Sequence, residues 1–236
     1  MGKGKKNKLP DRWLDYSVVG QEIQGIHIVA CKVPMNEGIF RNKNLDRELW
    51  FTPEKLIDLV PNVGCIIDLT ATNRYYDPKI FTEKGIQHVK IWCGGHGSVP
   101  NHITVNKFFQ ATDSFLRSSG KILMVHCTHG LNRTGYLVSR YLIERRGFEP
   151  EDAINAFNQA RGHNIERENY LLSLRGLTRR VCRNPAPLFN GMDLRPGHQV
   201  QAARYGRGSG RGGRGGRAGR GGRGPTAGNV DNVHGP

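Results

Sequence analysis

The sequence predicts an α/β fold in which helices flank a central, mostly parallel sheet. Apolar residues run consecutively, rather than alternating, through residues 63–70 and 121–127, which is typical of strands buried on both faces. Segments with helical spacing of apolar residues separate these runs, and strands that alternate with helices favour a parallel sheet. The chain has 236 residues, which is enough for one domain with a sizeable core and for tails outside it.

The elements can be assigned in order along the chain. A first strand is expected within residues 25–34, where the apolar run ends in a proline. A first helix is expected at residues 52–60, because Thr52 can cap its amino end and Pro53 suits the first helical position. Gly85 and Gly120 are expected to end two later helices. The remaining strands are predicted at residues 63–70, 86–92 and 121–127, and the remaining helices at residues 77–85, 103–120, 134–147, 150–161 and 166–180.

Composition separates a folded domain from basic ends. The folded domain is expected at residues 9–180, after a basic arm at residues 1–8 that holds four lysines. Residues 181–203 read as an irregular linker, since no helical or strand period continues there. Residues 204–224 contain seven arginines and eleven glycines and no apolar surface to offset their ordering entropy. We therefore expect this RGG tract, and the C-terminal residues 225–236, to be disordered.

The charge at the two ends favours polyanionic partners. The formal net charge is +15, and much of the excess lies in the arm and the RGG tract. Such a tract attracts RNA phosphates and stacks guanidinium groups on bases, so RNA is the expected ligand; a solvated tail with no dedicated ligand is the alternative. Methylation by an arginine methyltransferase would preserve the charge. The arginines concerned are Arg204, Arg207, Arg211, Arg214, Arg217, Arg220 and Arg223.

Cysteine usage and the N-terminal residues bear on location. Five cysteines without paired spacing, and no apolar leader, favour a reducing compartment. The N-terminal lysines fit part of a nuclear import signal, so we expect the nucleus, with the cytoplasm as the alternative. No apolar run reaches the length of a membrane span, so no membrane partner is expected. No heptad pattern is present, and a monomer is the default expectation.

One short motif carries the chemistry. The sequence HCTHGLNRTG, at residues 126–135, follows an apolar strand and opens a helix. A loop in this place turns its backbone N–H groups toward an anion, and the helix N-terminus adds a positive field. The same field lowers the pKa of Cys127, and Arg133 can bind two phosphate oxygens at once. A buried structural cysteine in an ordinary turn is the alternative, but it would not require the whole motif.

These parts suit phosphoryl transfer through a phosphocysteine. Cys127 would attack phosphorus, and the loop with Arg133 would stabilise the equatorial oxygens. Thr134 would help the sulfur to leave, and His126 would orient the loop. The predicted phosphate loop consists of Thr128, His129, Gly130, Leu131, Asn132 and Arg133.

No general acid is evident before the cysteine. The sequence has no Asp or Glu between Glu83 and Asp113, and Asp113 falls in a predicted helix. A tyrosine phenolate leaves with a pKa of about 10 and needs a proton donor. A phosphate leaving group has its last ionisation near pKa ~6 and leaves with little protonation. The missing acid therefore points to a phosphoanhydride, such as a 5′-triphosphate end, although His96 is a candidate donor.

Several segments resemble one branch of a known superfamily. LPDRWLDYSVVGQEIQGIHIVACKVP, IIDLTATNRYYD, HCTHGLNRTGYLVSRYLIE and RGHNIERENY are similar to the RNA 5′-triphosphatase branch of the cysteine-dependent (dual-specificity) phosphatases, over residues 9–180. The resemblance implies removal of the γ and then the β phosphate from RNA, without a metal or other cofactor. LPDRW and RGHNIERENY favour the stand-alone members over capping enzymes, whose K-x-D-G motif is absent. Ribonucleoprotein and splicing-related partners would fit such an enzyme.

The resemblance also suggests three residues outside the loop. Asp68, at the end of a strand, could support the site from below, or it could cap the following turn. Arg74 and Arg161 could contact the β-phosphate or the RNA backbone, although a surface or ion-pair role is the better prediction for each. Two other function classes stay open: a dual-specificity protein phosphatase, and a non-catalytic RNA-binding adaptor. A phosphoinositide phosphatase is disfavoured, because the loop lacks lysine.

Overall fold

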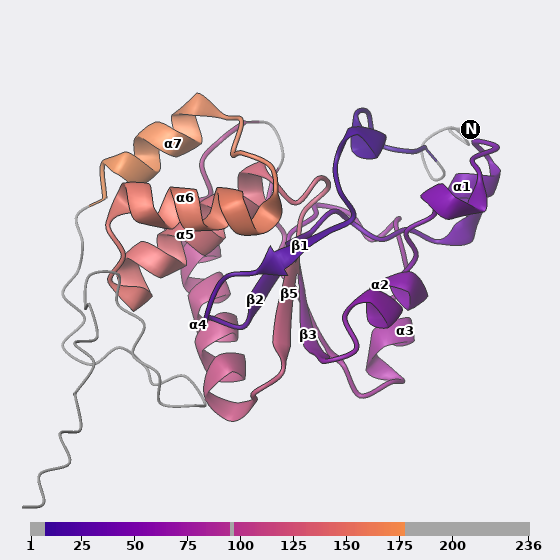
Figure 1. The fold of residues 1–236 in the computed structure, drawn as a ribbon, viewed down its shortest axis with the longest axis horizontal. Helices are drawn as coiled ribbons and strands as arrows, with labels where there is room; N and C mark the ends of the chain where they lie inside the picture. The colour runs from indigo at the N-terminus through magenta and orange to yellow at the C-terminus, as the bar shows by residue number, and fades with distance from the viewer. Residues whose placement is uncertain (1–7, 95–96, 178–236) are drawn as a thin grey trace, which may run out of the picture. The chain divides into compact units, whose positions relative to one another are not determined.

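A five-stranded sheet lies between two layers of helices (Figure 1). The computed structural model describes residues 8–94 and 97–177; the linker, the RGG tract, the C-terminal residues and nearly all of the basic arm lie outside them. The strand order is β1-β2-β5-β3-β4, and every pair is parallel except β1 with β2. The predicted fold class is confirmed. The strands are β1 (Val19–Glu22), β2 (Ile28–Cys31), β3 (Val63–Asp68), β4 (Gln87–Lys90) and β5 (Ile122–His126).

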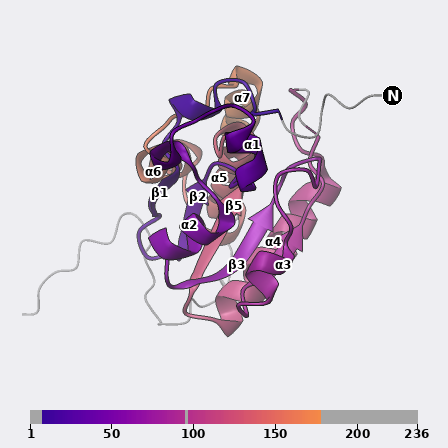
Figure 2. The same ribbon diagram turned by 90° about the vertical axis from the view of Figure 1, so that its right-hand side faces the viewer.

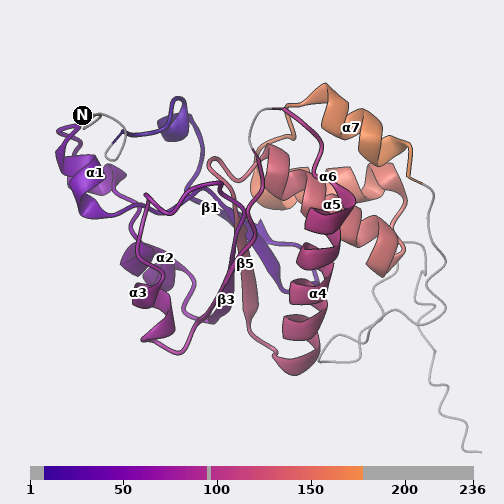
Figure 3. The ribbon, with the colours of Figure 1, turned by 180° about the vertical axis from the view of Figure 1, so that it is seen from behind.

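The helices divide between the two faces of the sheet. Figure 2 shows the first three helices in front of the strands. Figure 3, which views the molecule from behind, shows the last four helices on the side of the strands opposite to the first three. Each face buries its own apolar cluster. The first layer is α1 (Glu37–Arg41), α2 (Pro53–Leu59) and α3 (Lys79–Thr82), and the second is α4 (His102–Ser118), α5 (Asn132–Arg146), α6 (Pro150–Arg161) and α7 (Glu168–Arg175). No helix in either layer is long and apolar enough to cross a membrane.

Two elements were not predicted, and two predicted helices are shorter than expected. The edge strand β1 and the one-and-a-half-turn helix α1 lack a clear apolar period, since each contributes few residues to the core. Helix α3 spans only four residues, and α7 ends at Arg175 rather than at residue 180. Helix α4 ends at Ser118, before the predicted stop at Gly120. The predicted cap of α2 is confirmed, because the Thr52 hydroxyl accepts the N–H of Lys55 at 3.2 Å.

The carboxyl ends of three parallel strands meet at one edge of the sheet. Asp68 at the end of β3 lies opposite Lys90 of β4 on one side and opposite His126 of β5 on the other. Ligands of open α/β sheets bind outside the carboxyl ends of the strands. The loops that follow Asp68, Lys90 and His126 are therefore brought together where a site is expected.

Candidate active site

The loop between β5 and α5 is a tight turn that only glycine permits at its middle. Gly130 has a φ of +71°, and a Cβ atom there would lie 2.1 Å from the carbonyl oxygen of Cys31. The loop therefore packs directly against the end of β2, with no side chain between them. This close approach fixes the path of residues 127–131 and presents them at the N-terminus of α5.

Cys127 lies at the base of this loop and is only 3% exposed. Burial raises the pKa of its thiol, but the Arg133 guanidinium, the Thr134 hydroxyl and the backbone N–H groups of Thr134 and Gly130 lower it by more. The net pKa lies below its ordinary value. The Thr134 hydroxyl is buried and has no nitrogen or oxygen partner among the described residues, so it is available to the sulfur. These groups therefore favour the thiolate form of Cys127 more than in an ordinary cysteine.

Arg133 is held over the loop by backbone carbonyls. Its Nη1 donates to the carbonyl oxygens of Leu69 at 3.1 Å and Cys93 at 2.9 Å, which follow β3 and β4. Its Nη2 donates to the Thr128 hydroxyl at 2.9 Å. The guanidinium is therefore fixed by three elements of the fold and is preorganised next to the thiol, as stabilisation of an anionic transition state requires.

Arg161 lies beneath the loop, away from any substrate. It is 1% exposed and donates to the carbonyl oxygens of Gly130 at 3.2 Å and His129 at 3.1 Å. It also donates to the Ser17 hydroxyl at 2.6 Å and the Ser17 carbonyl at 2.8 Å. For this residue the favoured prediction, a surface or ion-pair role, is wrong, and so is a contact with the β-phosphate or the RNA backbone, because the side chain is buried. Arg161 instead ties the phosphate loop to the segment before β1.

Seven of the residues that the structure describes line a small cavity above the thiol, which we call the phosphate pocket. Its volume is about 140 Å³, a few times the roughly 30 Å³ of a water molecule, so it suits a phosphoryl group rather than a whole organic ligand. None of the lining residues is a carboxylate. They are Cys127, Thr128, His129, Asn132, Arg133, Arg167 and Tyr170.

Arg167 and Tyr170 of the phosphate pocket were not predicted. Asn132 brings this segment to the loop, because its Oδ1 accepts the backbone N–H groups of Glu166 and Arg167, both at 2.9 Å. The Tyr170 hydroxyl donates to the Ser98 carbonyl at 2.9 Å and faces the pocket from α7. Both residues lie in the RGHNIERENY segment, which had been used only for the resemblance. Arg167 is thus a cation that lines the same pocket as the motif residues Asn132 and Arg133, and only the folded structure shows that they lie together.

The other predicted residues of the motif differ in whether their side chains reach the phosphate pocket. Leu131 is buried and Gly130 faces β2, so neither lines the phosphate pocket. His129 lines the pocket, and its Nε2 lies 2.8 Å from the Asp11 carbonyl oxygen. His126 lies below the thiol, with Nδ1 3.2 Å from the Cys127 carbonyl and Nε2 2.8 Å from the Tyr76 hydroxyl. Burial lowers the pKa of His126, so the ring is neutral near pH 7.

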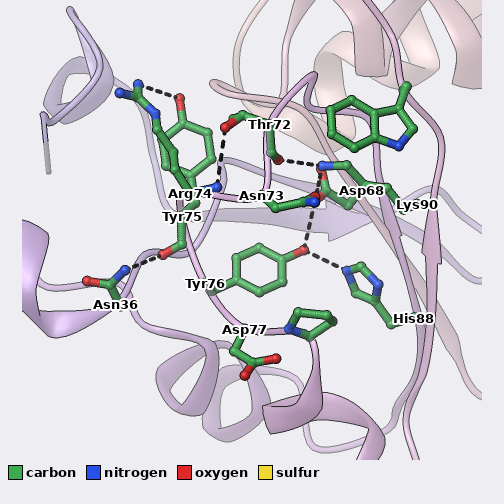
Figure 4. Close-up of a pocket in the computed structure, with 12 residues that line it drawn as sticks. Asn36, Asp68, Thr72, Asn73, Arg74, Tyr75, Tyr76, Asp77, His88 and Lys90 are labelled. Atoms are coloured by element: carbon green, nitrogen blue, oxygen red, sulfur yellow. Dashed lines mark hydrogen bonds and ion pairs between the residues drawn. The ribbon is translucent and has the colours of Figure 1, made fainter. Parts of the chain in front are cut away.

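Asp68 caps the turn after β3 and faces a different cavity. Its Oδ1 accepts the Thr70 N–H at 2.7 Å, and its Oδ2 accepts the Lys90 ammonium group at 2.8 Å. Burial raises the pKa of this carboxyl, but the His126 ring, the Lys90 ammonium group and the Thr70 N–H lower it below its ordinary value. Asp68 does not line the phosphate pocket. It lines a neighbouring cavity of about 690 Å³, together with Arg74 (Figure 4).

The two candidate proton donors differ in whether the structure describes them. Asp113 lies within helix α4, as predicted, where its Oδ1 accepts the Tyr141 hydroxyl at 2.9 Å, and it does not line the phosphate pocket. His96 lies outside the described residues. Across the described ranges, no group of three His, Cys, Asp or Glu side chains is placed to hold a metal ion.

Comparisons with known proteins agree with this site. The model of the dual specificity phosphatase catalytic domain matches residues 55–180. The RNA/RNP complex-1-interacting phosphatase of Homo sapiens is 44% identical over 175 residues, which cover 71% of this chain and 52% of that protein. A tyrosine-protein phosphatase of Autographa californica nuclear polyhedrosis virus is 39% identical over 166 residues, covering 70% of this chain and 98% of that protein. This chain therefore spans about half the length of its human relative.

A solved structure supports the fold alone. The crystal structure of Tk-PTP in the active form aligns with a TM-score of 0.51 and 16% sequence identity, covering 66% of this chain and 95% of that chain. At this identity the likeness extends to the arrangement of strands and helices and not to the ligand.

Proposed function

Because the chain belongs to the dual specificity phosphatase family, we propose that it is an RNA 5′-triphosphatase and diphosphatase, which removes the γ and then the β phosphate through a phosphocysteine. One observation carries the proposal. The phosphate pocket combines a thiol of lowered pKa with a fixed guanidinium, and none of the described residues that line it is a carboxylate. A phosphoanhydride is the substrate whose leaving group needs a proton donor least.

The mechanism follows from the positions of these groups. The Cys127 thiolate attacks the γ-phosphorus, and the bond from that phosphorus to the bridging oxygen breaks as the RNA diphosphate leaves. Arg133 and the loop N–H groups bind the equatorial oxygens in both steps. Water then attacks the phosphocysteine, the thiolate leaves, and a water proton passes to the released phosphate or to solvent. The Thr134 hydroxyl stabilises the departing thiolate. A second cycle would act on the diphosphate end.

Two further observations support RNA as the substrate. The human relative is named for an interaction with an RNA/RNP complex. The RGG tract adds seven arginines to this chain, which suits a polyanionic partner of low sequence preference. A nuclear location, ribonucleoprotein partners and methylation of the tract stay predictions, since those segments lie outside the described residues.

A protein phosphatase is the second candidate. The viral relative is named a tyrosine-protein phosphatase, and it is 39% identical over nearly its whole length. A phosphotyrosine leaving group with a pKa of about 10 would need a general acid. His96 is the candidate donor from the sequence, so activity on phosphopeptides would depend on that side chain.

Phosphate release from a short RNA with a 5′-triphosphate, measured in EDTA beside a phosphotyrosine peptide, tests the proposal. We expect release from RNA, a 5′-monophosphate product, and a loss of at least about 1000-fold in Cys127→Ser, because a serine hydroxyl does not ionise near neutral pH. Cys65→Ser is the matched control, since burial raises the pKa of that thiol to about 12 and it lies within β3. Its turnover should stay within a few-fold of the wild type.

Other outcomes separate the alternatives. Release from the peptide but not from RNA would overturn the RNA proposal and favour the protein phosphatase. A diphosphate product would limit the enzyme to the first step. Binding of RNA without release from either substrate would favour a non-catalytic adaptor.

A further inference from the structure

A large cavity, which we call the side pocket, lies next to the phosphate pocket. Its volume of about 690 Å³ falls in the range of about 300–1,000 Å³ that is typical of sites for small organic ligands. The carboxyl ends of β3 and β4 form one wall, and the segment of residues 72–78 forms another. Figure 4 shows the Tyr76 hydroxyl directed toward His88 and the Asp68–Lys90 pair, with Arg74 and Tyr75 on the other side of the cavity.

The contacts of Arg133 lie one residue away from the lining of the side pocket. Arg133 donates to the carbonyl oxygens of Leu69 and Cys93. These residues directly follow Asp68 and Trp92, which line the side pocket. One residue step spans about 3.8 Å between α-carbons. A ligand whose phosphate reaches Cys127 can therefore place the group attached to that phosphate chain at the side pocket.

An exposed aromatic side chain stands at this pocket. Trp92 is 59% exposed, although a tryptophan usually buries most of its surface. The Lys90 ammonium group lies over its ring, 5.0 Å from the ring centre, and orients the indole. The ring thus offers open aromatic surface to a stacking partner.

The polar groups of the side pocket favour an uncharged partner. The Lys90 ammonium group already donates to Asp68 Oδ2 at 2.8 Å, the Thr70 hydroxyl at 2.8 Å and the Thr72 carbonyl at 2.7 Å, so its three N–H bonds are used. Burial lowers the pKa of His88 to about 4, so its ring is neutral near pH 7. At this wall of the pocket the Asp68 carboxylate would repel a second phosphate, and the other lining cation, Arg74, lies across the cavity against Tyr75, 4.8 Å from the centre of its ring.

A nucleobase fits these observations. It is flat and uncharged, it stacks on aromatic rings, and its edge carries donors and acceptors that match the side chains of Asn73 and His88. We propose that the side pocket binds a base of the substrate RNA near the 5′-triphosphate, with Trp92 as its stacking platform. This inference rests on the proposed RNA substrate. It identifies the part of the site that would favour RNA over a polyphosphate without a base.

The test compares RNA with inorganic tripolyphosphate, which has the same anhydride bonds but no base. We expect Trp92→Ala to lower kcat/KM for 5′-triphosphate RNA by about 10-fold relative to kcat/KM for tripolyphosphate, mainly through KM, because a stacked base contributes a loss of that order. Trp92→Phe should restore most of the ratio, since phenylalanine keeps an aromatic face. Leu59→Ala is the matched control, as Leu59 is exposed at the end of α2 and lines neither pocket.

Each outcome bears on one of the two proposals. Cleavage of RNA by the wild type with no change of the ratio in Trp92→Ala would overturn the side-pocket inference and leave the proposed function standing. An equal loss on both substrates would also overturn it, since the residue would then support the fold or the chemistry. Failure of the wild type to cleave RNA would remove the proposed function itself. A loss of kcat/KM for a phosphotyrosine peptide, but not for RNA, in Trp92→Ala would assign the side pocket to a protein substrate.

Discussion

The phosphate pocket and the side pocket lie next to each other, but they are built in different ways. The phosphate pocket is small, and its shape comes from a loop whose path Gly130 and Arg161 fix from below. The side pocket is about five times larger, and its polar side chains are occupied with one another. The phosphate pocket has a small volume and charged groups that can reach a ligand. The side pocket has a large volume, but most of its charged groups are already paired. If the side pocket binds a base as proposed, chemistry and recognition are divided between the two pockets, and Arg133 binds Leu69 and Cys93, which directly follow lining residues of the side pocket.

Among variants that keep the Cys127 thiol, the largest effect is expected at Arg133. Arg133→Lys keeps one positive charge but loses the planar fork that holds two phosphate oxygens and contacts Leu69 and Cys93. We expect kcat to fall on the order of 100- to 1,000-fold, as for removal of a transition-state donor. Steady-state phosphate release measures it.

Arg74→Lys is the control for this change, because Arg74 lines the side pocket and not the phosphate pocket. Its kcat should change by less than about 3-fold, the size of effect usual for a contact outside the reacting centre. A similar loss of kcat in Arg133→Lys and Arg74→Lys would show that catalysis is not confined to the phosphate pocket.

The sequence predicted the phosphate pocket well where the residues are contiguous. A motif of ten residues, which runs from the last residue of β5 to the first turn of α5, contains the thiol, the guanidinium and the N–H groups, so their proximity needs no knowledge of the rest of the fold. Arg167 and Tyr170 join them only because Asn132 binds the backbone of residues 166–167. Arg161 was misjudged for the same reason, since its carbonyl partners are distant in sequence and leave no pattern.

The fold was predictable where burial imposes a pattern. The central strands β3 and β5 are buried along their whole length and show as continuous apolar runs. The edge strand β1 is half-exposed, and its four residues, VGQE, carry no such signal. The side pocket was also beyond prediction, because it needs Asp68, Lys90 and the segment 72–78 together. These residues come together because β3 and β4 are neighbours in the sheet, and the local sequence does not indicate that pairing.

A smaller loss of kcat is expected on substitution of Thr134, and it tests how the pKa of Cys127 is lowered. Thr134→Val removes the buried hydroxyl that lowers the pKa of Cys127. The thiolate is the reactive form, so activity is present above this pKa and is lost as the pH falls through it. The variant should raise the pKa toward the ordinary 9.0 and shift the loss of activity to higher pH. A charge-assisted hydrogen bond is involved, so we expect kcat near pH 7 to fall about 10-fold.

The rate of Cys127 alkylation by iodoacetamide against pH measures the shift directly. Thr112→Val is the matched control, because the Thr112 hydroxyl in α4 is also buried without a partner among the described residues. Its alkylation profile should coincide with that of the wild type. An unchanged profile in Thr134→Val would mean that Arg133 and the loop N–H groups alone set the pKa.

The smallest effect on catalysis is expected at Asp68. Asp68→Asn removes the charge that pairs with Lys90 at 2.8 Å but keeps an oxygen for the Thr70 N–H. Because Asp68 faces the side pocket, kcat for tripolyphosphate should fall by less than about 5-fold, while the free energy of unfolding at pH 7 should drop by about 2 kcal/mol, as for a broken charged hydrogen bond. The pKa of this carboxyl is lower in the folded than in the unfolded chain, where it is about 3.9. Its stabilisation is therefore present above about pH 4 and is lost as the pH falls through the folded pKa.

Urea unfolding at pH 7 and pH 3, beside turnover, separates the two roles of Asp68. The stability difference between wild type and Asp68→Asn should shrink toward pH 3, while Asp77→Asn, which alters an exposed carboxylate of the same pocket, should show little difference at either pH. A 100-fold loss of kcat with unchanged stability would instead place Asp68 in the chemistry, as a support of the thiolate through His126. The 3.9 Å between Asp68 Oδ1 and His126 Nδ1 is long for a hydrogen bond, whereas the contacts to Lys90 and Thr70 are short. That geometry is why the effect is expected on stability and pocket shape rather than on the reacting sulfur.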